Sequence, residues 1–247
     1  MSNIPDLLTT LSGINVADKE TWENFRRDEV KSLCERFEYG IRDIEKPENL
    51  YFSIERTYEI YGMICREVTG GFGNFKFPFK LYFPKSTDKL YFPQNTDKPF
   101  PAFIYVAHEN VENNMKFEDD GNMYWHDANS VLPLKYITDR GYAIAVMPTR
   151  EIYREYSSHS NYKVGVFKEV NAQRTKYSWA SISAWAWGVS RVLDYLEWEP
   201  MVDATRVAAI GHSRSGKAAL WATATDERIF LGVPNNSGCC SARYRQS

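Results

Sequence analysis

Cysteine is scarce in this sequence, and its positions suit neither cross-linking nor metal binding. The 247 residues contain only Cys34, Cys65, Cys239 and Cys240. Small disulfide-stabilised domains carry cysteine far more densely, and structural zinc sites need pairs spaced as C-x-x-C. The sequence therefore predicts no disulfide framework, no metal site and no cofactor. It is also typical of a protein from a reducing compartment.

A basic excess, a long apolar run and a secretory leader are also missing. The 30 Lys and Arg residues face 32 Asp and Glu residues, for a net charge of −2, so we expect no nucleic-acid partner. No apolar run approaches the roughly 18 residues that span a bilayer, so we expect no membrane partner. The start, 1–6, lacks a basic region before an apolar stretch, which predicts a cytoplasmic protein.

The chain does contain enough apolar material for a large core. Hydrophobic residues make up 43% of the sequence and aromatic residues 15%, which excludes global disorder. The length fits one α/β domain, and no stretch reads as a linker. We predict a single domain over 1–247, with a helical lead-in at 1–57 and a sheet with crossover helices at 58–247.

Hydrophobic spacing predicts an alternation of strands and helices. An amphipathic helix at 21–39 ends at Gly40, and strands follow at 58–68 and 75–83. Short apolar strands then alternate with helices: strands at 102–107, 142–147, 206–210 and 229–233, and helices at 131–140, 178–198 and 217–225. This order predicts an α/β fold with a mostly parallel, three-layer sheet and right-handed crossovers.

The turn at 211–217, GHSRSGK, carries the candidate chemistry. A serine on a sharp strand-to-helix turn is held in a strained conformation, and its neighbours must be small. Gly211 and Ser215, two residues on either side of Ser213, meet that demand. The N-terminus of the following helix would direct free N–H groups toward a developing oxyanion. The turn is therefore typical of a nucleophile elbow.

Two other interpretations of this turn remain open. The string also satisfies the GxxxxGK pattern of a phosphate-binding loop, which would make the protein a P-loop-type nucleotide binder. Against this, Ala218 stands where a magnesium-binding hydroxyl belongs, and His212 and Arg214 are bulky. An ordinary turn with an incidental serine is the third interpretation.

The helix and turn together resemble a known family of hydrolases. Glucuronoyl esterases, also called 4-O-methyl-glucuronoyl methylesterases, have before their nucleophile a helix similar to SWASISAWAWGVSRVLDYL at 178–196. So do related bacterial proteins described as acetyl xylan esterases. In both groups a G-[CH]-S-R-x-G-K turn follows, as at 211–217. The likeness continues in VDATRV at 202–207, WA at 221–222 and NSGC at 236–239.

This resemblance implies a fold, a reaction and a set of residues. It implies an α/β-hydrolase fold and a serine carboxylic ester hydrolase acting through an acyl-enzyme on glucuronoyl or acetyl esters of xylan-type sugars. Ser213 would be the nucleophile, and Arg214 would stabilise the oxyanion with its guanidinium. Lys217 would face the sugar hydroxyls, although a solvated helix lysine is the alternative. A small carbohydrate ester is the expected partner.

The general base and the acid expected of such an enzyme are not found after the serine. All four histidines precede it: His108, His126, His159 and His212. Asp226 and Glu227 lie about 13 residues further on, roughly 20 Å along a helix. Asn236 stands where some glucuronoyl esterases place the acid. We therefore expect a fragment of a longer esterase, with C-terminal strands and helices missing, that is inactive by itself. The alternative is a remnant that retains at most sugar binding.

Overall fold

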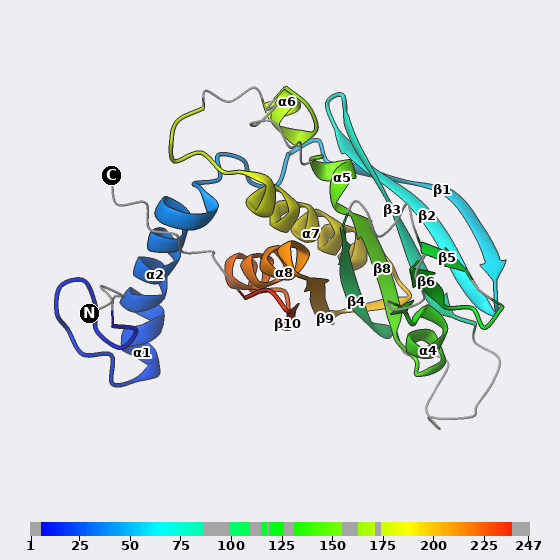
Figure 1. The fold of residues 1–247 in the computed structure, drawn as a ribbon, viewed down its shortest axis with the longest axis horizontal. Helices are drawn as coiled ribbons and strands as arrows, with labels where there is room; N and C mark the ends of the chain where they lie inside the picture. Colours follow the sequence, from blue (N-terminus) through cyan, green and yellow to red (C-terminus); the bar gives the residue numbers. More distant parts are fainter. Residues whose placement is uncertain are drawn as a thin grey trace. The chain divides into compact units, whose positions relative to one another are not determined.

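The computed structural model describes residues 6–85, 99–108, 115–117, 119–125, 131–154, 163–170 and 174–238 (Figure 1). They form two compact units where the sequence predicted a single domain. The first unit combines the described parts of 1–43 and 173–180. The second contains the described parts of 44–172 and 181–238. A chain segment from far along the sequence thus completes the N-terminal unit, which hydrophobic periodicity does not predict.

The first unit is built on one continuous helical stretch, as predicted. It consists of α1 (Lys19–Thr21), η1 (Trp22–Arg26), α2 (Arg27–Cys34) and η2 (Glu35–Tyr39). The carboxylate of Asp18 caps its start by accepting a hydrogen bond from the Thr21 amide at 2.7 Å. Gly40 ends it with a φ of 81°, a backbone conformation that glycine adopts without strain.

The second unit is built on a seven-stranded mixed sheet. Its strand order is β1 (Tyr51–Ile60), β2 (Met63–Phe72), β3 (Phe75–Pro84), β8 (Ala143–Pro148), β4 (Phe100–Ala107), β9 (Val202–His212) and β10 (Leu231–Asn235). The pairs from β1 to β8 are antiparallel, and those from β8 to β10 are parallel. A small second sheet contains β5 (Met115–Phe117), β6 (Met123–Trp125) and β7 (Val131–Leu132).

The expectation of a mostly parallel sheet is therefore wrong for the first half of the unit. The strand predicted at 58–68 is in fact the end of β1, a two-residue turn and the start of β2. The turn residues Tyr61 and Gly62 have φ values of 49° and 73°, which is the type I′ geometry of tight hairpins. Such a short connection permits only antiparallel pairing. The sheet also begins at Tyr51, inside the segment predicted as a helical lead-in.

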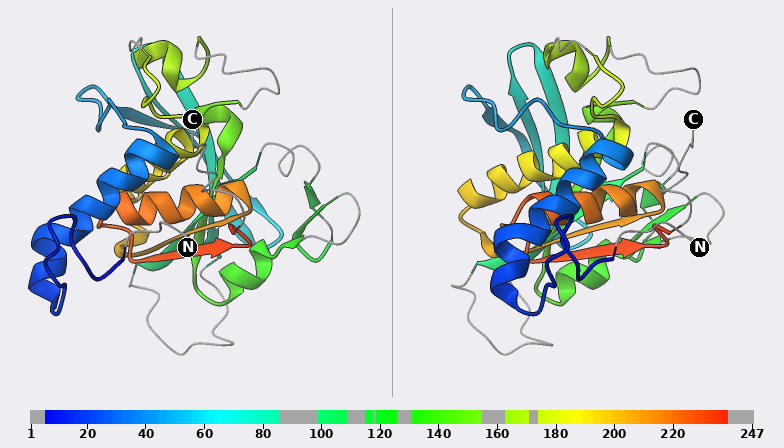
Figure 2. Two further views of the ribbon diagram at one scale, coloured as in Figure 1. Left: turned by 60° about the vertical axis from the view of Figure 1, so that its left-hand side comes forward. Right: turned by 90° about the vertical axis from the view of Figure 1, so that its left-hand side faces the viewer.

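Helices cover both faces of this sheet, which confirms a three-layer α/β architecture (Figures 1 and 2). On one face lie α5 (Thr149–Ile152), α7 (Ser181–Trp198) and α8 (Arg214–Thr225). On the other, α4 (Leu134–Asp139) packs through Leu134 with Ile144 and Val146 of β8. The alternating residue Met147 faces Gly188 of α7 instead. A further helix, α6, spans Val166–Val170.

The long helix α7 packs against one face of the sheet. Nearly all of its residues are buried, and it contacts β2, β4, β8 and β9. Trp187 packs edge-to-face on Phe72 and Phe77 of the antiparallel strands. None of the helices in the described ranges is both long and apolar enough to cross a membrane.

A buried ion network connects α7 to the segment that follows α8. The Asp194 carboxylate, 1% exposed, accepts from Arg191 Nε at 2.6 Å and from Arg228 Nη1 at 2.8 Å. Arg228 also pairs with Asp226. Burial alone would raise the pKa of Asp226, but hydrogen bonds from Arg228 and Ser190 outweigh it, so this pKa is lowered. The network fixes the far end of α8 against α7.

We predict that Asp194→Ala lowers the free energy of unfolding by about 3–5 kcal/mol, because it leaves the buried Arg191 guanidinium without its counter-ion. Asp203→Ala is the matched control, since Asp203 and Arg206 form an i,i+3 pair with the same 2.6 Å distance but an arginine that is 52% exposed. It should cost about 1 kcal/mol. Urea denaturation measures both values, and equal losses would contradict a special role for the buried pair.

Candidate active site

Ser213 sits at a sharp, strained junction between β9 and α8. Its backbone has φ 56° and ψ −121°, and it is one of three non-glycine residues with positive φ in the described ranges. These angles belong to the first central position of a type II′ turn, which is normally glycine. Holding a serine there costs on the order of 1–3 kcal/mol. The turn is also shorter than the sequence predicted: the helix was expected to begin at residue 217, but α8 already begins at Arg214.

Two glycines allow the start of the helix to cross the end of the strand. A Cβ on Gly211 would lie 2.3 Å from the Ser215 carbonyl oxygen, and a Cβ on Gly216 would lie 2.9 Å from the Gly211 oxygen. The Ser213 amide donates to the Asn235 carbonyl at 2.9 Å, which joins the turn to β10. Because α8 already begins at Arg214, residues 214–217 are helical, and this disfavours a phosphate-binding loop over 211–217.

Among the described residues, positive charge gathers on the first turn of α8, next to the serine. The side chain of Ser213 makes no capping hydrogen bond to α8, and the residue is exposed. The first turn of this helix contains no acidic residue, and Arg214 and Lys217 both lie close to its N-terminus. Lys217 is half-buried, one helical turn beyond Ser213, whose carbonyl accepts from the Lys217 amide at 3.1 Å. Helix dipole and side-chain charge therefore both favour an anion beside Ser213.

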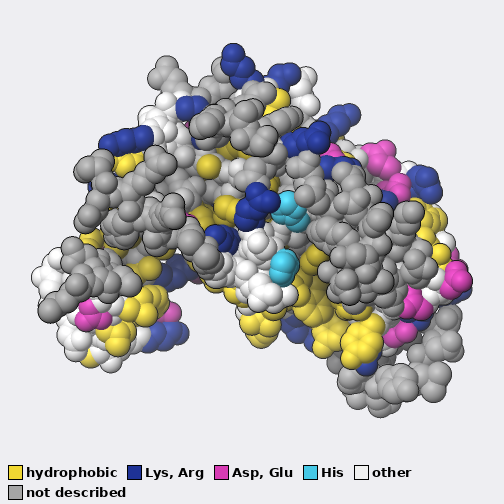
Figure 3. Space-filling model, viewed as in Figure 1, with side chains coloured by type: hydrophobic (Ala, Val, Ile, Leu, Met, Phe, Trp, Pro, Cys, Tyr) yellow, Lys and Arg dark blue, Asp and Glu magenta, His cyan; other side chains and the backbone are white. Residues whose placement is uncertain are grey.

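The sheet register brings His108 to this turn, a histidine for which the sequence favoured a polar loop position over a place in the pocket. In the parallel pair of β4 and β9, Val106 lies opposite Gly211. His108 lies two residues further along, and its Nε2 lies 2.9 Å from Nη2 of Arg214, the residue after Ser213. Figure 3 shows histidine side chains next to Lys and Arg side chains on this face. The pairing of two distant segments is not visible in either segment alone.

The other sequence candidates occupy different places. His212, the last residue of β9, is exposed, and Asn236 follows β10 with a φ of 45°. Asp226 lies beyond the far end of the 12-residue helix α8 and is paired with Arg228. His126, His159 and the loop at 109–114 lie outside the described residues. Within the described part of the chain, no cluster of His, Cys, Asp and Glu is suited to hold a metal ion.

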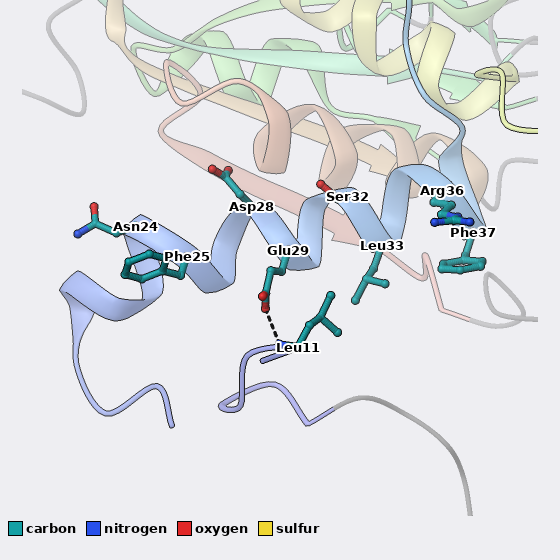
Figure 4. Close-up of a pocket in the computed structure, with 9 residues that line it drawn as sticks. All are labelled: Leu11, Asn24, Phe25, Asp28, Glu29, Ser32, Leu33, Arg36 and Phe37. Atoms are coloured by element: carbon teal, nitrogen blue, oxygen red, sulfur yellow. Dashed lines mark hydrogen bonds between the residues drawn. The ribbon is translucent and has the colours of Figure 1, made fainter. Parts of the chain in front are cut away.

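A pocket of about 590 Å³ in the first unit does not contain these residues. It runs along α2 and is drawn in Figure 4; its lining comprises Leu11, Asn24, Phe25, Asp28, Glu29, Ser32, Leu33, Arg36 and Phe37. The Leu11 amide donates to Glu29 Oε2 at 2.9 Å, and this bond lowers the pKa of that carboxylate. Since Glu29 is already engaged in this bond and the lining includes no residue of the strained turn, we place the candidate chemistry at Ser213.

Comparison with known proteins agrees with the geometry of the turn. A family model described as glucuronyl esterase from fungi matches residues 85–247. The chain belongs to this family. This confirms the family resemblance seen in the sequence, and with it the α/β-hydrolase fold.

Relatives of this glucuronyl esterase family member match almost its entire length. Carbohydrate esterase MZ0003, from an unknown prokaryotic organism, is 28% identical over 97% of this chain and 59% of its own length. A 4-O-methyl-glucuronoyl methylesterase from Cerrena unicolor is 26% identical over 96% of this chain and 43% of its own. A glucuronoyl esterase structure from Solibacter usitatus superposes with a TM-score of 0.74 at 26% identity, over 93% of this chain and 62% of that one. The chain thus spans about half the length of these curated relatives.

The strained backbone at position 213 predicts a difference in stability between two variants. Ser213→Gly should raise the free energy of unfolding by about 1 kcal/mol relative to Ser213→Ala, because glycine adopts this φ and ψ without steric cost while alanine retains the strain. Both variants lack the hydroxyl, so they differ only in backbone freedom. Chemical denaturation of the pair checks this, and a glycine variant less stable than alanine would show that the turn is not strained.

Proposed function

We propose that this chain carries the nucleophile of a serine carbohydrate esterase that cleaves glucuronoyl esters through an acyl-enzyme. The observation that carries the proposal is Ser213 itself, exposed in a strained turn at the N-terminus of α8, in a chain of the glucuronyl esterase family. Activated serines need this accessibility, because the hydroxyl oxygen must reach the carbonyl carbon of the bound ester.

The residues around Ser213 supply the charge stabilisation that ester cleavage requires. Attack by Ser213 Oγ on the carbonyl carbon places negative charge on the carbonyl oxygen. The guanidinium of Arg214 and the amides in the first turn of α8 stabilise that oxygen. The general base takes the serine proton and returns it to the ester oxygen as the alcohol leaves, and water then hydrolyses the acyl-enzyme to release the glucuronic acid and free the serine. Lys217, one helical turn away, is proposed to bind hydroxyl groups of the sugar.

Uronoyl esters are the substrate class that the relatives favour. Several curated relatives are named 4-O-methyl-glucuronoyl methylesterases, among them one from Hypocrea jecorina that is 46% identical over 26% of this chain and 14% of its own length. A variant of the Sporotrichum thermophile glucuronoyl esterase, solved with methyl 4-O-methyl-β-D-glucopyranuronate, has a TM-score of 0.63. We therefore propose a small glucuronate ester as the substrate, with acetyl esters as the comparison in the assay.

The general base is proposed to come from outside these 247 residues. Among the described histidines, His108 already has its Nε2 next to Arg214, and His212 directly precedes the nucleophile in the chain. A base must be within hydrogen-bond reach of the serine hydroxyl, which an adjacent strand residue does not readily achieve. Asn236, the residue at the expected acid position, cannot carry a charge.

We predict that a fluorophosphonate probe labels the native gene product at Ser213. Ser213→Ala should abolish labelling, and Ser53→Ala, which removes an exposed serine on β1, should not change it. Benzyl D-glucuronate and an acetylated xylo-oligosaccharide are then compared as substrates, and we expect faster hydrolysis of the glucuronate. A product that shows neither labelling nor hydrolysis would contradict the proposed esterase activity and favour a remnant that only binds sugar.

The origin of the base is tested separately with two histidine variants. His126→Ala and His159→Ala should leave labelling of the native product unchanged, because the base is proposed to lie elsewhere. The intact mass of that product, compared with 28.6 kDa for this chain, shows whether further sequence is available to supply it. Loss of labelling in either variant would assign the base to this chain and overturn the proposal.

A further inference from the structure

We infer that His108 is a positioning residue that holds the guanidinium of Arg214 beside Ser213. The inference rests on the proposed function, in which Arg214 stabilises the oxyanion. It concerns a contact between residues that stand 106 positions apart in the chain. It also gives His108 a role other than that of a general base.

The pairing of β4 and β9 brings the backbones of His108 and Arg214 to the same edge of the sheet. β4 and β9 are parallel neighbours, and the pair Val106 and Gly211 ends their register. Because parallel strands advance together, residue 108 emerges at the same edge of the sheet as residue 213. The carboxyl edge of a parallel sheet is also where ligands bind in open α/β folds. His108 therefore lies at the same edge of the sheet as Ser213.

The contact itself determines the protonation state of the imidazole. Arg214 Nη2 lies 2.9 Å from His108 Nε2, which is hydrogen-bond distance. A guanidinium has only donors, so the lone pair on Nε2 must accept, and the proton of neutral His108 must be on Nδ1. With its Nε2 lone pair engaged in this way, the ring has no acceptor nitrogen left to take the proton of Ser213. The geometry thus separates His108 from the role of base.

The imidazole of His108 packs against a side chain that is itself fixed, the indole of Trp185. Its ring meets Trp185 of α7 edge-on, with centroids 6.1 Å apart and planes at 83°. Trp185 is only 1% exposed, and its Nε1 donates to the Tyr153 carbonyl at 2.9 Å. A buried, hydrogen-bonded indole has little freedom to move, so it restricts the ring that packs on it. The buried helix α7 therefore contributes to the position of His108.

This arrangement restrains a long, exposed side chain. Arg214 is exposed, and a long exposed arginine loses rotamer entropy each time it is fixed for catalysis. The bond to His108 uses one of the five N–H donors of the guanidinium. It orients the planar fork before substrate arrives, and preorganised donors are what stabilise a developing oxyanion. His108 acts through Arg214 and does not touch the reacting atoms.

Hydrolysis of benzyl D-glucuronate by variants of the native product tests this role. Arg214→Ala should lower kcat by about 10²–10³, as loss of one oxyanion donor does. His108→Ala should lower kcat by roughly tenfold to a hundredfold with little change in KM, since a misplaced catalytic group costs up to about 10². His108→Gln retains an acceptor for Arg214 and should recover most of the rate.

The double variant distinguishes positioning from an independent role. If His108 acts only through Arg214, then His108→Ala should have no further effect on kcat in the Arg214→Ala background. The same fold loss in both backgrounds, or a glutamine variant as slow as alanine, would overturn the inference. Fluorophosphonate labelling of Ser213 in each variant shows that the turn is still formed, and loss of labelling in His108→Ala alone would point to a base instead.

A measurement that needs no activity separates the failure of this inference from the failure of the proposed function. Nitrogen-15 spectra of the imidazole should show a protonated Nδ1 and an unprotonated Nε2 at His108, and this pattern should change in Arg214→Ala. Arg206→Ala, an exposed arginine nearer the start of β9, is the control and should leave the pattern unchanged. Activity without this pattern would overturn the positioning role alone, whereas the pattern without esterase activity would overturn its catalytic purpose together with the proposed function.

Discussion

The backbone of Ser213 is the constraint on which the rest of the site depends. A serine at φ 56° is stable only where the chain on both sides is held firmly, because this conformation costs on the order of 1–3 kcal/mol. Gly211 makes the crossing of strand and helix possible, since a side chain there would overlap the Ser215 backbone. The same geometry exposes the hydroxyl and aligns the N-terminus of α8 with it. Strain and electrostatic stabilisation thus arise from one turn.

The surrounding layers hold that turn from three directions. β9 lies between β4 and β10, and the Ser213 amide is bonded to β10. Below the sheet, α7 packs on both β9 and α8. The Asp194 network with Arg228 then fixes the far end of α8, so that the helix has little freedom to unwind the strained residue at its start. The buried charges thus stabilise the position of Ser213 from the opposite end of α8.

Sequence patterns predicted the elements that are uniform along their length. The three- and four-residue spacing of α7, the apolar run of β4 and the Gly-x-Ser turn all correspond to what is found. The hairpin at Tyr61 and Gly62 was missed because tyrosine seldom adopts positive φ, which leaves Gly62 alone as the signal of the turn. The bond between His108 and Arg214 was missed for a different reason. It depends on the register of two strands, which follows from the folded sheet and not from either segment.

In the proposed mechanism, the charges at the turn contribute to one part of catalysis, the stabilisation of the oxyanion. Arg214, Lys217 and the dipole of α8 all favour negative charge, and the Arg214 guanidinium lies within hydrogen-bond distance of His108 Nε2. In the proposed mechanism this site stabilises the oxyanion of an attacked ester, and the base that accepts the serine proton is proposed to lie elsewhere. Oxyanion stabilisation and substrate binding alone still accelerate hydrolysis by roughly 10³–10⁴ over water in serine hydrolases deprived of their triad. The proposed role of Arg214 is therefore independent of which group supplies the base, because Arg214 would act on the oxyanion and the base on the serine proton.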